Sequence, residues 1–128
     1  IVMCEEVNLA RFLEHSLFRL CGYLGIRPRW LRSSELPKPP ALKGEERLLA
    51  ICDAADITRY INLPGGRGLY SSEAFARRGN RLSFIKQEKV TYPQFSDSFT
   101  PDLSIVDLLM FNDLETAGRI LQEYRIHD

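Results

Sequence analysis

The segment 59–75 constrains the fold more than any other part of the chain. A run with strand character stops at Pro64, three glycines follow within residues 65–68, and a helix-like segment begins directly afterwards. Glycine permits positive φ and a close approach of the backbone to a ligand. A strand, a glycine-rich turn and a helix N-terminus together often hold an anion, because the free N–H groups and the helix dipole point the same way. The segment matches neither a Walker P-loop nor a G-x-G-x-x-G fingerprint, so it is either an anion site or a simple turn.

Hydrophobic periodicity predicts the other elements. Apolar residues at spacings of three and four predict a helix over 9–24, with Asn8 as its N-cap and Gly25 just past its end. Further helices are expected over 44–55, 71–78, 105–111 and 113–124, and extended strands over 28–33, 59–63 and 81–87.

The last third of the chain carries two further expectations. Residues 105–111 are apolar nearly all round, which predicts a buried helix. Residues 88–103 are irregular and contain three aromatic side chains, and a long loop of this kind is typical of a functional segment.

The alternation of helices and strands predicts an α/β protein with a parallel sheet. We expect one domain over residues 1–128, a Rossmann-like three-layer sandwich with a small, mostly parallel sheet. Three strands leave two exposed edges, which a protein normally covers. The pattern therefore also predicts an incomplete domain from which a preceding segment has been lost.

Charge and cysteine content limit the partners. The formal net charge is zero, so we expect no general attraction to nucleic acid or to an anionic membrane surface. No apolar run is long enough for a membrane span. The three cysteines form no C-x-x-C pair, which argues against a zinc site and for a reducing, cytoplasmic location, with Cys21 and Cys52 as small buried side chains.

Several spaced segments resemble the WbqC-like protein family. They are the run Tyr-Ile-Asn-Leu-Pro-Gly-Gly-Arg-Gly-Leu-Tyr at 60–70 and the pair 92–95 and 99–112, with 31–36 and 46–52 fitting the same pattern, and their combination is what makes the likeness specific. The likeness extends from about residue 9 onward. Family members are longer and carry a Gln-Pro-x-Tyr-x-Pro-Trp-x-Gly-Tyr-Phe motif in their N-terminal half, which is not found here. The resemblance therefore predicts the C-terminal half of such a protein, with the N-terminal half as a missing partner.

The resemblance also implies a function. Family members are bacterial and often encoded among genes for O-antigen and other surface polysaccharides. The implied activity is a transferase that adds a small acyl or aminoacyl group to a sugar. The resemblance assigns no catalytic residue and no cofactor. The positions that match the family pattern are Ser33, Ser34, Gly65, Gly66, Arg67, Tyr70, Tyr92, Pro93, Gln94, Ser104 and Asp107.

Topology gathers most of these residues into one candidate site. In open α/β sheets, ligands bind beyond the carboxyl ends of the strands. If three parallel strands end at residues 33, 63 and 87, one rim carries the predicted ligand-binding residues Ser33, Ser34, Gly65, Gly66, Arg67, Tyr70, Tyr92 and Gln94. The expected ligand is a small anion such as a nucleotide, a nucleotide-sugar or an acyl donor. Arg67 would bind its anionic group, Gln94 would hydrogen-bond, and the tyrosines would stack on a base or sugar ring.

Other interpretations stay open. Ser33 and Ser34 also suit a turn, and Tyr92 and Phe95 also suit a core. Asp107 lies in an apolar helix and needs a partner such as an arginine or a loop N–H. The chain could equally be a non-catalytic nucleotide-binding or nucleotide-sugar-binding module, or a structural or interaction domain.

Histidine offers no alternative route to an enzyme. His15 is expected on the polar side of the first helix, and His127 lies at a terminus that is expected to fray. No Ser-His-Asp or Cys-His set can be assembled from the sequence, and no cluster has metal-ligand spacing.

Overall fold

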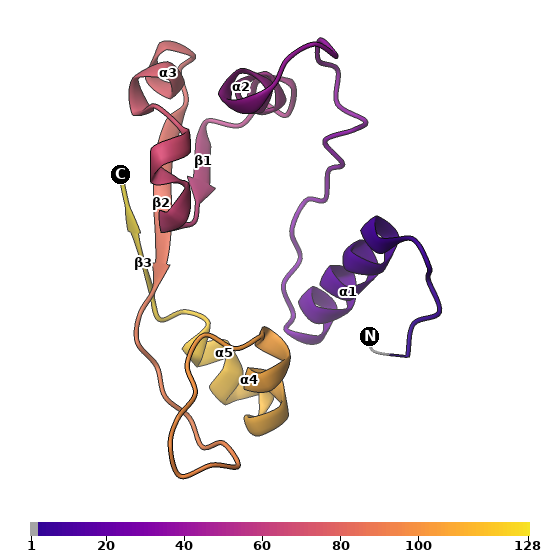
Figure 1. Cartoon of the computed structure of the whole chain (residues 1–128), viewed down its shortest axis with the longest axis vertical. Coiled ribbons are helices and arrows are strands. Elements are labelled where there is room, and N and C mark those ends of the chain that lie inside the picture. The colour runs from indigo at the N-terminus through magenta and orange to yellow at the C-terminus, as the bar shows by residue number, and fades with distance from the viewer. Residues whose placement is uncertain (1–2) are drawn as a thin grey trace.

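The computed structural model describes residues 3–128 and has a mixed α/β architecture (Figure 1). Its elements follow in the order α1 (Leu9–Tyr23), α2 (Gly44–Ala54), β1 (Arg59–Asn62), the 3-10 helix η1 (Pro64–Leu69), α3 (Ser72–Arg77), β2 (Arg81–Gln87), α4 (Ile105–Phe111), α5 (Leu114–Ile120) and β3 (Tyr124–His127).

The three strands form one small sheet in the order β1-β2-β3. β1 and β2 are parallel, with Arg59 opposite Arg81, and the crossover between them runs through η1 and α3. β3 is antiparallel to β2, with Phe84 opposite His127. The mixed α/β class and a parallel pair are thus confirmed, whereas a Rossmann-like sandwich with a mostly parallel sheet is not.

Two segments differ from their predicted secondary structure. Residues 28–33 form no strand and lie in the connector between α1 and α2, away from the sheet (Figure 1). Residues 124–127, expected at the end of a helix and beyond it, form β3 instead, because α5 ends at Ile120. Pairing with β2 satisfies the N–H and C=O groups of a free sheet edge. The stabilisation from this pairing depends on which segments the fold brings together, and a local sequence pattern holds no information about that.

The buried side chains form two separate clusters. The larger joins α2 and α3 to one face of β2 through Leu49, Cys52, Ala74, Phe75, Leu82 and Phe84. The smaller lies between α4 and α5 and contains Leu108, Ala117 and Ile120. Figure 1 shows these helix pairs at opposite ends of the sheet, so β2 and the loop that follows it connect two small cores.

Helix α1 forms as predicted, but its apolar face is exposed. The Asn8 side chain accepts a hydrogen bond from the Arg11 N–H at 3.1 Å, and Gly25 adopts φ +70° past the C-cap. No residue of α1 is buried. The helix is held to the connector by Phe18, whose ring centroid lies 4.3 Å from that of Trp30, and by an ion pair from Glu14 to Arg32. Its position therefore depends on few contacts.

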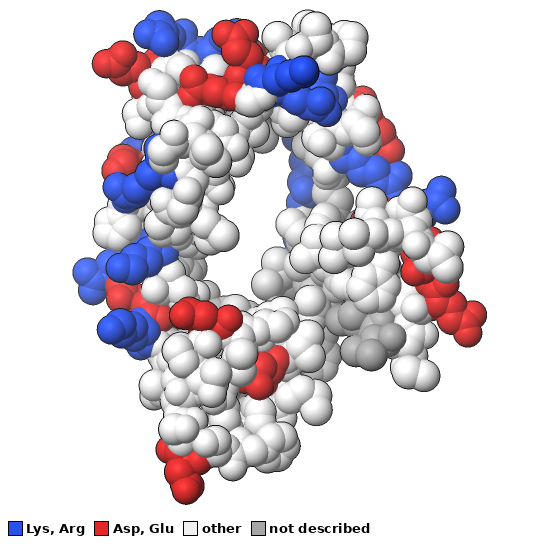
Figure 2. Space-filling model, viewed as in Figure 1, with Lys and Arg blue, Asp and Glu red and all other residues white. Residues whose placement is uncertain are grey.

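The molecule is open rather than compact. It exposes 9927 Å², against about 7,000 Å² for a compact monomer of this mass. Figure 2 shows an opening through the molecule, bounded on one side by the sheet and on the other by α1 and its connector. The prediction that α4 is buried was wrong, because only Leu108 is buried and Met110 is 78% exposed.

Two further sequence expectations meet the structure here. Cys52 is buried in the larger core and Cys21 is half-buried, and the described cysteines carry free thiols. Within residues 3–128, none of the helices has the length and apolar character that crossing a bilayer requires.

Candidate functional site

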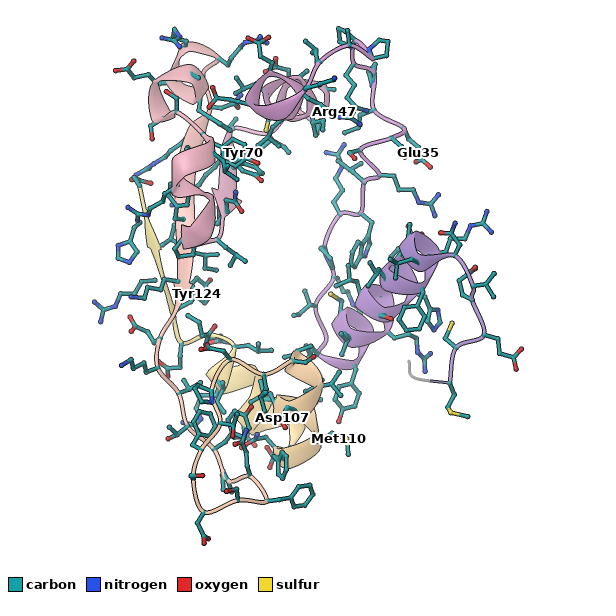
Figure 3. All side chains as sticks on the ribbon, in the orientation of Figure 1. Glu35, Arg47, Tyr70, Asp107, Met110 and Tyr124 are labelled. Atoms are coloured by element: carbon teal, nitrogen blue, oxygen red, sulfur yellow. The ribbon has the colours of Figure 1, made fainter. Side chains whose placement is uncertain are left out.

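The residues predicted to share one rim lie in three places. Ser33 and Ser34 are in the connector between α1 and α2, and Arg67 is on η1 beside the sheet. Tyr92 and Gln94 belong to the loop that precedes α4. Figure 3 shows Glu35, the neighbour of Ser34, across the opening from Tyr70, with Asp107 at the far end of the molecule. The serines reach no common rim, because residues 28–33 never join the sheet.

The glycine-rich turn contributes to a hollow on the sheet. The hollow has a volume of about 290 Å³ and is lined by Pro64, Arg67, Phe84, Lys86 and His127. Three of these five side chains are basic, and they come from η1, β2 and β3. Among residues 3–128, none of the three forms an ion pair within 4.0 Å. The Arg67 and Lys86 charges of the hollow therefore have no ion-pair partner among the described residues.

The local sequence explains how Arg67 reaches this position. Pro64 begins η1, where its fixed φ suits the first turn of a helix and its missing N–H costs nothing. Gly66 is buried against Asn62, so η1 folds back closely onto the end of β1. The Arg67 guanidinium carbon then lies 4.8 Å from the centroid of the Phe84 ring, within cation–π range. Phe84 is only 5% exposed, so Arg67 rests on a fixed surface.

His127 was wrongly expected to lie at a frayed terminus. In β3 it is the ladder partner of Phe84. Lys86 has a similar origin, since it lies two residues beyond Phe84 on β2 and shares its face of the sheet. The signal in the sequence was the run Tyr-Arg-Ile-His at 124–127, which contains two β-favouring residues, but its partner strand could not be read from it.

Tyr70 does not line the hollow and belongs to the larger core. Its ring makes edge-on contacts with Tyr60 and Phe75, at centroid distances of 6.0 and 6.3 Å. Burial raises the pKa of Tyr60, and neighbouring Tyr70 raises it further. This aromatic group supports the crossover from β1 to β2, which carries η1.

The loop after β2 has its own polar network. The Tyr92 hydroxyl donates to Asp107 Oδ2 at 2.8 Å, and the Gln94 amide donates to the same oxygen at 2.9 Å. Gln94 also accepts from the Thr100 N–H at 2.8 Å. Burial raises the pKa of Tyr92, and its hydrogen bond to Asp107 raises it further. The structure therefore joins Tyr92, Gln94 and Asp107, and it places them apart from Arg67.

Asp107 has partners other than the predicted ones. A tyrosine hydroxyl and a side-chain amide take the place of the expected arginine or loop N–H. Two hydrogen bonds to one carboxylate oxygen stabilise the loop against the start of α4. Within residues 3–128, no three His, Cys, Asp or Glu side chains gather in a metal-binding arrangement.

Comparison with known proteins gives one family and one curated relative. Residues 1–118 match the WbqC-like protein family, which is nearly the whole chain, so a match confined to the C-terminal half of the family is not borne out. "Uncharacterized protein Rv1507c" of Mycobacterium tuberculosis (strain ATCC 25618 / H37Rv) is 28% identical over 106 residues. That alignment covers 82% of this chain and 45% of the relative, so the chain spans less than half of the relative's length. No solved structure matches.

Proposed function

Because this chain belongs to the WbqC-like protein family, we propose that it takes part in the transfer of a small acyl or aminoacyl group to a sugar during synthesis of bacterial surface polysaccharide such as O-antigen. Its own part is to hold an anionic portion of a ligand in the hollow around Arg67. The ligand class is a nucleotide, a nucleotide-sugar or an activated acyl donor.

One observation carries the proposal: three basic side chains surround an apolar floor in a single hollow. The Arg67 guanidinium lies over the buried Phe84 ring, and Lys86 and His127 stand on the two adjacent strands. Arginine offers a planar fork of donors that suits phosphate or carboxylate, and lysine adds a mobile point charge. Figure 2 shows Lys and Arg side chains, interspersed with Asp and Glu, on the side of the molecule that the sheet occupies.

The proposed transfer needs charge stabilisation more than a dedicated nucleophile. An amine or hydroxyl of the sugar attacks the acyl carbonyl, a C–N or C–O bond forms, and the bond to the leaving group breaks with its electron pair. The nucleophile loses one proton, which the leaving group or water accepts. Positive charge that is already in place where the leaving group gains negative charge lowers the barrier to such a step. We assign this role to the hollow and name no general base.

Binding of pyrophosphate, ADP and UDP tests the proposal. Isothermal titration of the Arg67→Gln protein should show affinity reduced by about ten- to a hundredfold, since a charge-assisted hydrogen bond contributes about 1.5–3 kcal/mol. The matched control is Arg77→Gln, because Arg77 is an exposed arginine of α3 outside the hollow. That control should bind like the unchanged protein, and both variants should unfold at the same denaturant concentration.

The outcomes separate the proposal from its rivals. Equal affinity in both variants would exclude an anion site at Arg67. Loss of folded structure in Arg67→Gln alone would favour a purely structural turn. Normal binding in a complete protein that transfers no acyl group would favour a non-catalytic nucleotide-binding module.

A further inference from the structure

A second hollow lies where the loop after β2 passes α5. It has a volume of about 410 Å³ and lies beside the end of the β2–β3 ladder, which the Glu88 N–H extends by donating to the Glu123 carbonyl at 2.8 Å. Residues 89–93 form one wall, and Asn112, α5 and the turn after α5 form the other. None of the predicted ligand-binding residues in the glycine-rich turn lines this second hollow.

The charged side chains of this hollow have opposite signs and no mutual ion pair. Lys89 and Arg119 contribute cations, and Glu123 contributes a carboxylate. Within residues 3–128, none of the three pairs with an opposite charge within 4.0 Å. Opposite charges that share a hollow without joining are complementary to a ligand that carries both signs.

The neutral lining leaves room for such a ligand. The Tyr92 hydroxyl is already bound to Asp107, and its ring packs against Phe99 and the smaller core, so this side chain lines the hollow as a fixed apolar surface. The Asn112 amide nitrogen donates to the Leu108 carbonyl at 2.8 Å, which leaves its side-chain oxygen to accept from a ligand. Thr116 adds a hydroxyl that can donate or accept.

We propose that this second hollow binds a small zwitterionic ligand, with the ligand's ammonium group on Glu123 and its anionic group on Arg119 and Lys89. Two chemical sources fit: a free α-amino acid, or an amino sugar that carries a phosphate. The assignment as a second substrate site rests on the proposed transfer function, whereas the binding itself does not.

The two hollows are close enough to serve one reaction. Lys86 lines the first and Lys89 lines the second. Their α-carbons are at most about 11 Å apart, because an extended chain advances about 3.3–3.6 Å per residue. This spacing along the chain is compatible with one bisubstrate arrangement that uses both hollows.

Matched ligand pairs test the charge assignment. Glucosamine 6-phosphate is compared with glucose 6-phosphate, which lacks the amine, and with glucosamine, which lacks the phosphate; alanine is compared with lactate. In the pair that represents the ligand's source, Glu123→Gln should weaken binding of the amine-bearing member at least about tenfold and leave the amine-free member unchanged. Arg119→Gln should weaken both sugar phosphates and leave glucosamine unchanged. Glu115→Gln, an exposed acidic residue of α5 outside the hollow, is the control.

The pattern of results decides both the site and the source. A Glu123-dependent amine preference for alanine alone identifies an amino acid, and the same preference for the sugar phosphate alone identifies an amino sugar. Equal effects of Glu123→Gln on both members of every pair would overturn the proposal, as would sugar-phosphate binding that depends on Arg67 and on neither Glu123 nor Arg119. The Arg67 site could still stand after either result, because its own titration uses pyrophosphate and nucleotides.

Discussion

Replacing Gly66 by alanine should strain the turn that carries Arg67. A Cβ atom at this position would lie 2.4 Å from Asn62 Nδ2 and 3.0 Å from Asn62 Cγ. Gly66 does not adopt positive φ, so the requirement is for space and not for an unusual backbone conformation. Because the Cγ atom is also too close, the whole amide group of Asn62 has to move.

The magnitude follows from what that movement breaks. Asn62 Oδ1 accepts a hydrogen bond from the Leu63 N–H at 2.8 Å. Such a bond contributes about 1 kcal/mol net, and forcing an extra carbon into a packed contact costs about 1–3 kcal/mol. Alanine recovers about 0.4–1 kcal/mol by restricting the unfolded chain. We expect a net loss of about 1–3 kcal/mol in the free energy of unfolding.

Chemical denaturation of five variants, four single and one double, measures this effect. Gly65→Ala and Gly68→Ala are the controls, since a Cβ at either position meets nothing within 4 Å. They should change stability little or raise it slightly. Asn62→Ala removes the obstructing amide, so Gly66→Ala should cost less than about 0.5 kcal/mol in that background, and the double-mutant cycle should show coupling.

Two results would refute the reasoning. One is a Gly66→Ala protein as stable as the Gly65→Ala control. The other is a cost that stays the same when Asn62 is alanine. If the reasoning holds, Gly66→Ala should also weaken pyrophosphate binding, because η1 sets the position of Arg67 over Phe84.

Two pH effects follow from hydrogen-bonded side chains. The pKa of Tyr92 is raised by burial and by its hydrogen bond to Asp107, so the neutral phenol stabilises the loop below pH about 10, and this contribution is lost as the pH rises through the folded-state pKa. Asp107→Asn should lower the pKa of Tyr92 in an absorbance titration. An unchanged titration curve would contradict the hydrogen-bond network. Hydrogen bonds from Arg81 and Ser83 lower the pKa of Asp128 from 3.8 to about 2. The ionised Asp128 therefore contributes fully to stability above its ordinary pKa, and this contribution is lost as the pH falls through about 2. In an NMR titration, Arg81→Gln should move the pKa of Asp128 back toward 3.8, and an unchanged pKa would rule out the ion pair between Arg81 and Asp128.

Local sequence signals predicted the helices well, because each signal acts within a few residues. Asn8 caps α1, and the Ser71 and Ser104 side chains accept hydrogen bonds at the starts of α3 and α4. The alternation over 81–87 predicted β2 with its observed bounds. The Asp113 side chain likewise accepts from the Thr116 N–H at the start of α5. Each of these features needs only its neighbours along the chain.

Burial was harder to predict than secondary structure. The apolar stripe of α1 and the apolar sides of α4 predicted contacts with a core, yet both helices expose much of that surface. A periodic stripe shows which face would be buried if another surface met it. It does not show whether such a surface is present, and in this molecule α1 contacts little beyond its own connector.

The candidate site also contains residues that local sequence could predict and residues that only the fold brings in. Sequence alone predicted a site role for Arg67 on the glycine-rich turn, and it predicted one for Tyr92 and Gln94 in the loop after β2. It missed Lys86 and His127, and it grouped Ser33 with residues that lie across an open molecule from it. His127 could not be found because its importance comes from pairing with Phe84, a residue far away in the sequence.

The amino-acid sequence by itself therefore determined the family, the helices with their caps, the two parallel strands and the turn that presents Arg67. These depend on local backbone preferences and on residue spacing, which are properties of residues close together in the sequence. Only the tertiary structure decided that residues 124–127 complete the sheet, that one hollow collects basic side chains from three elements, and that the loop after β2 forms a separate hollow with α5. Those features arise from contacts between distant segments, whose free energy depends on which surfaces meet.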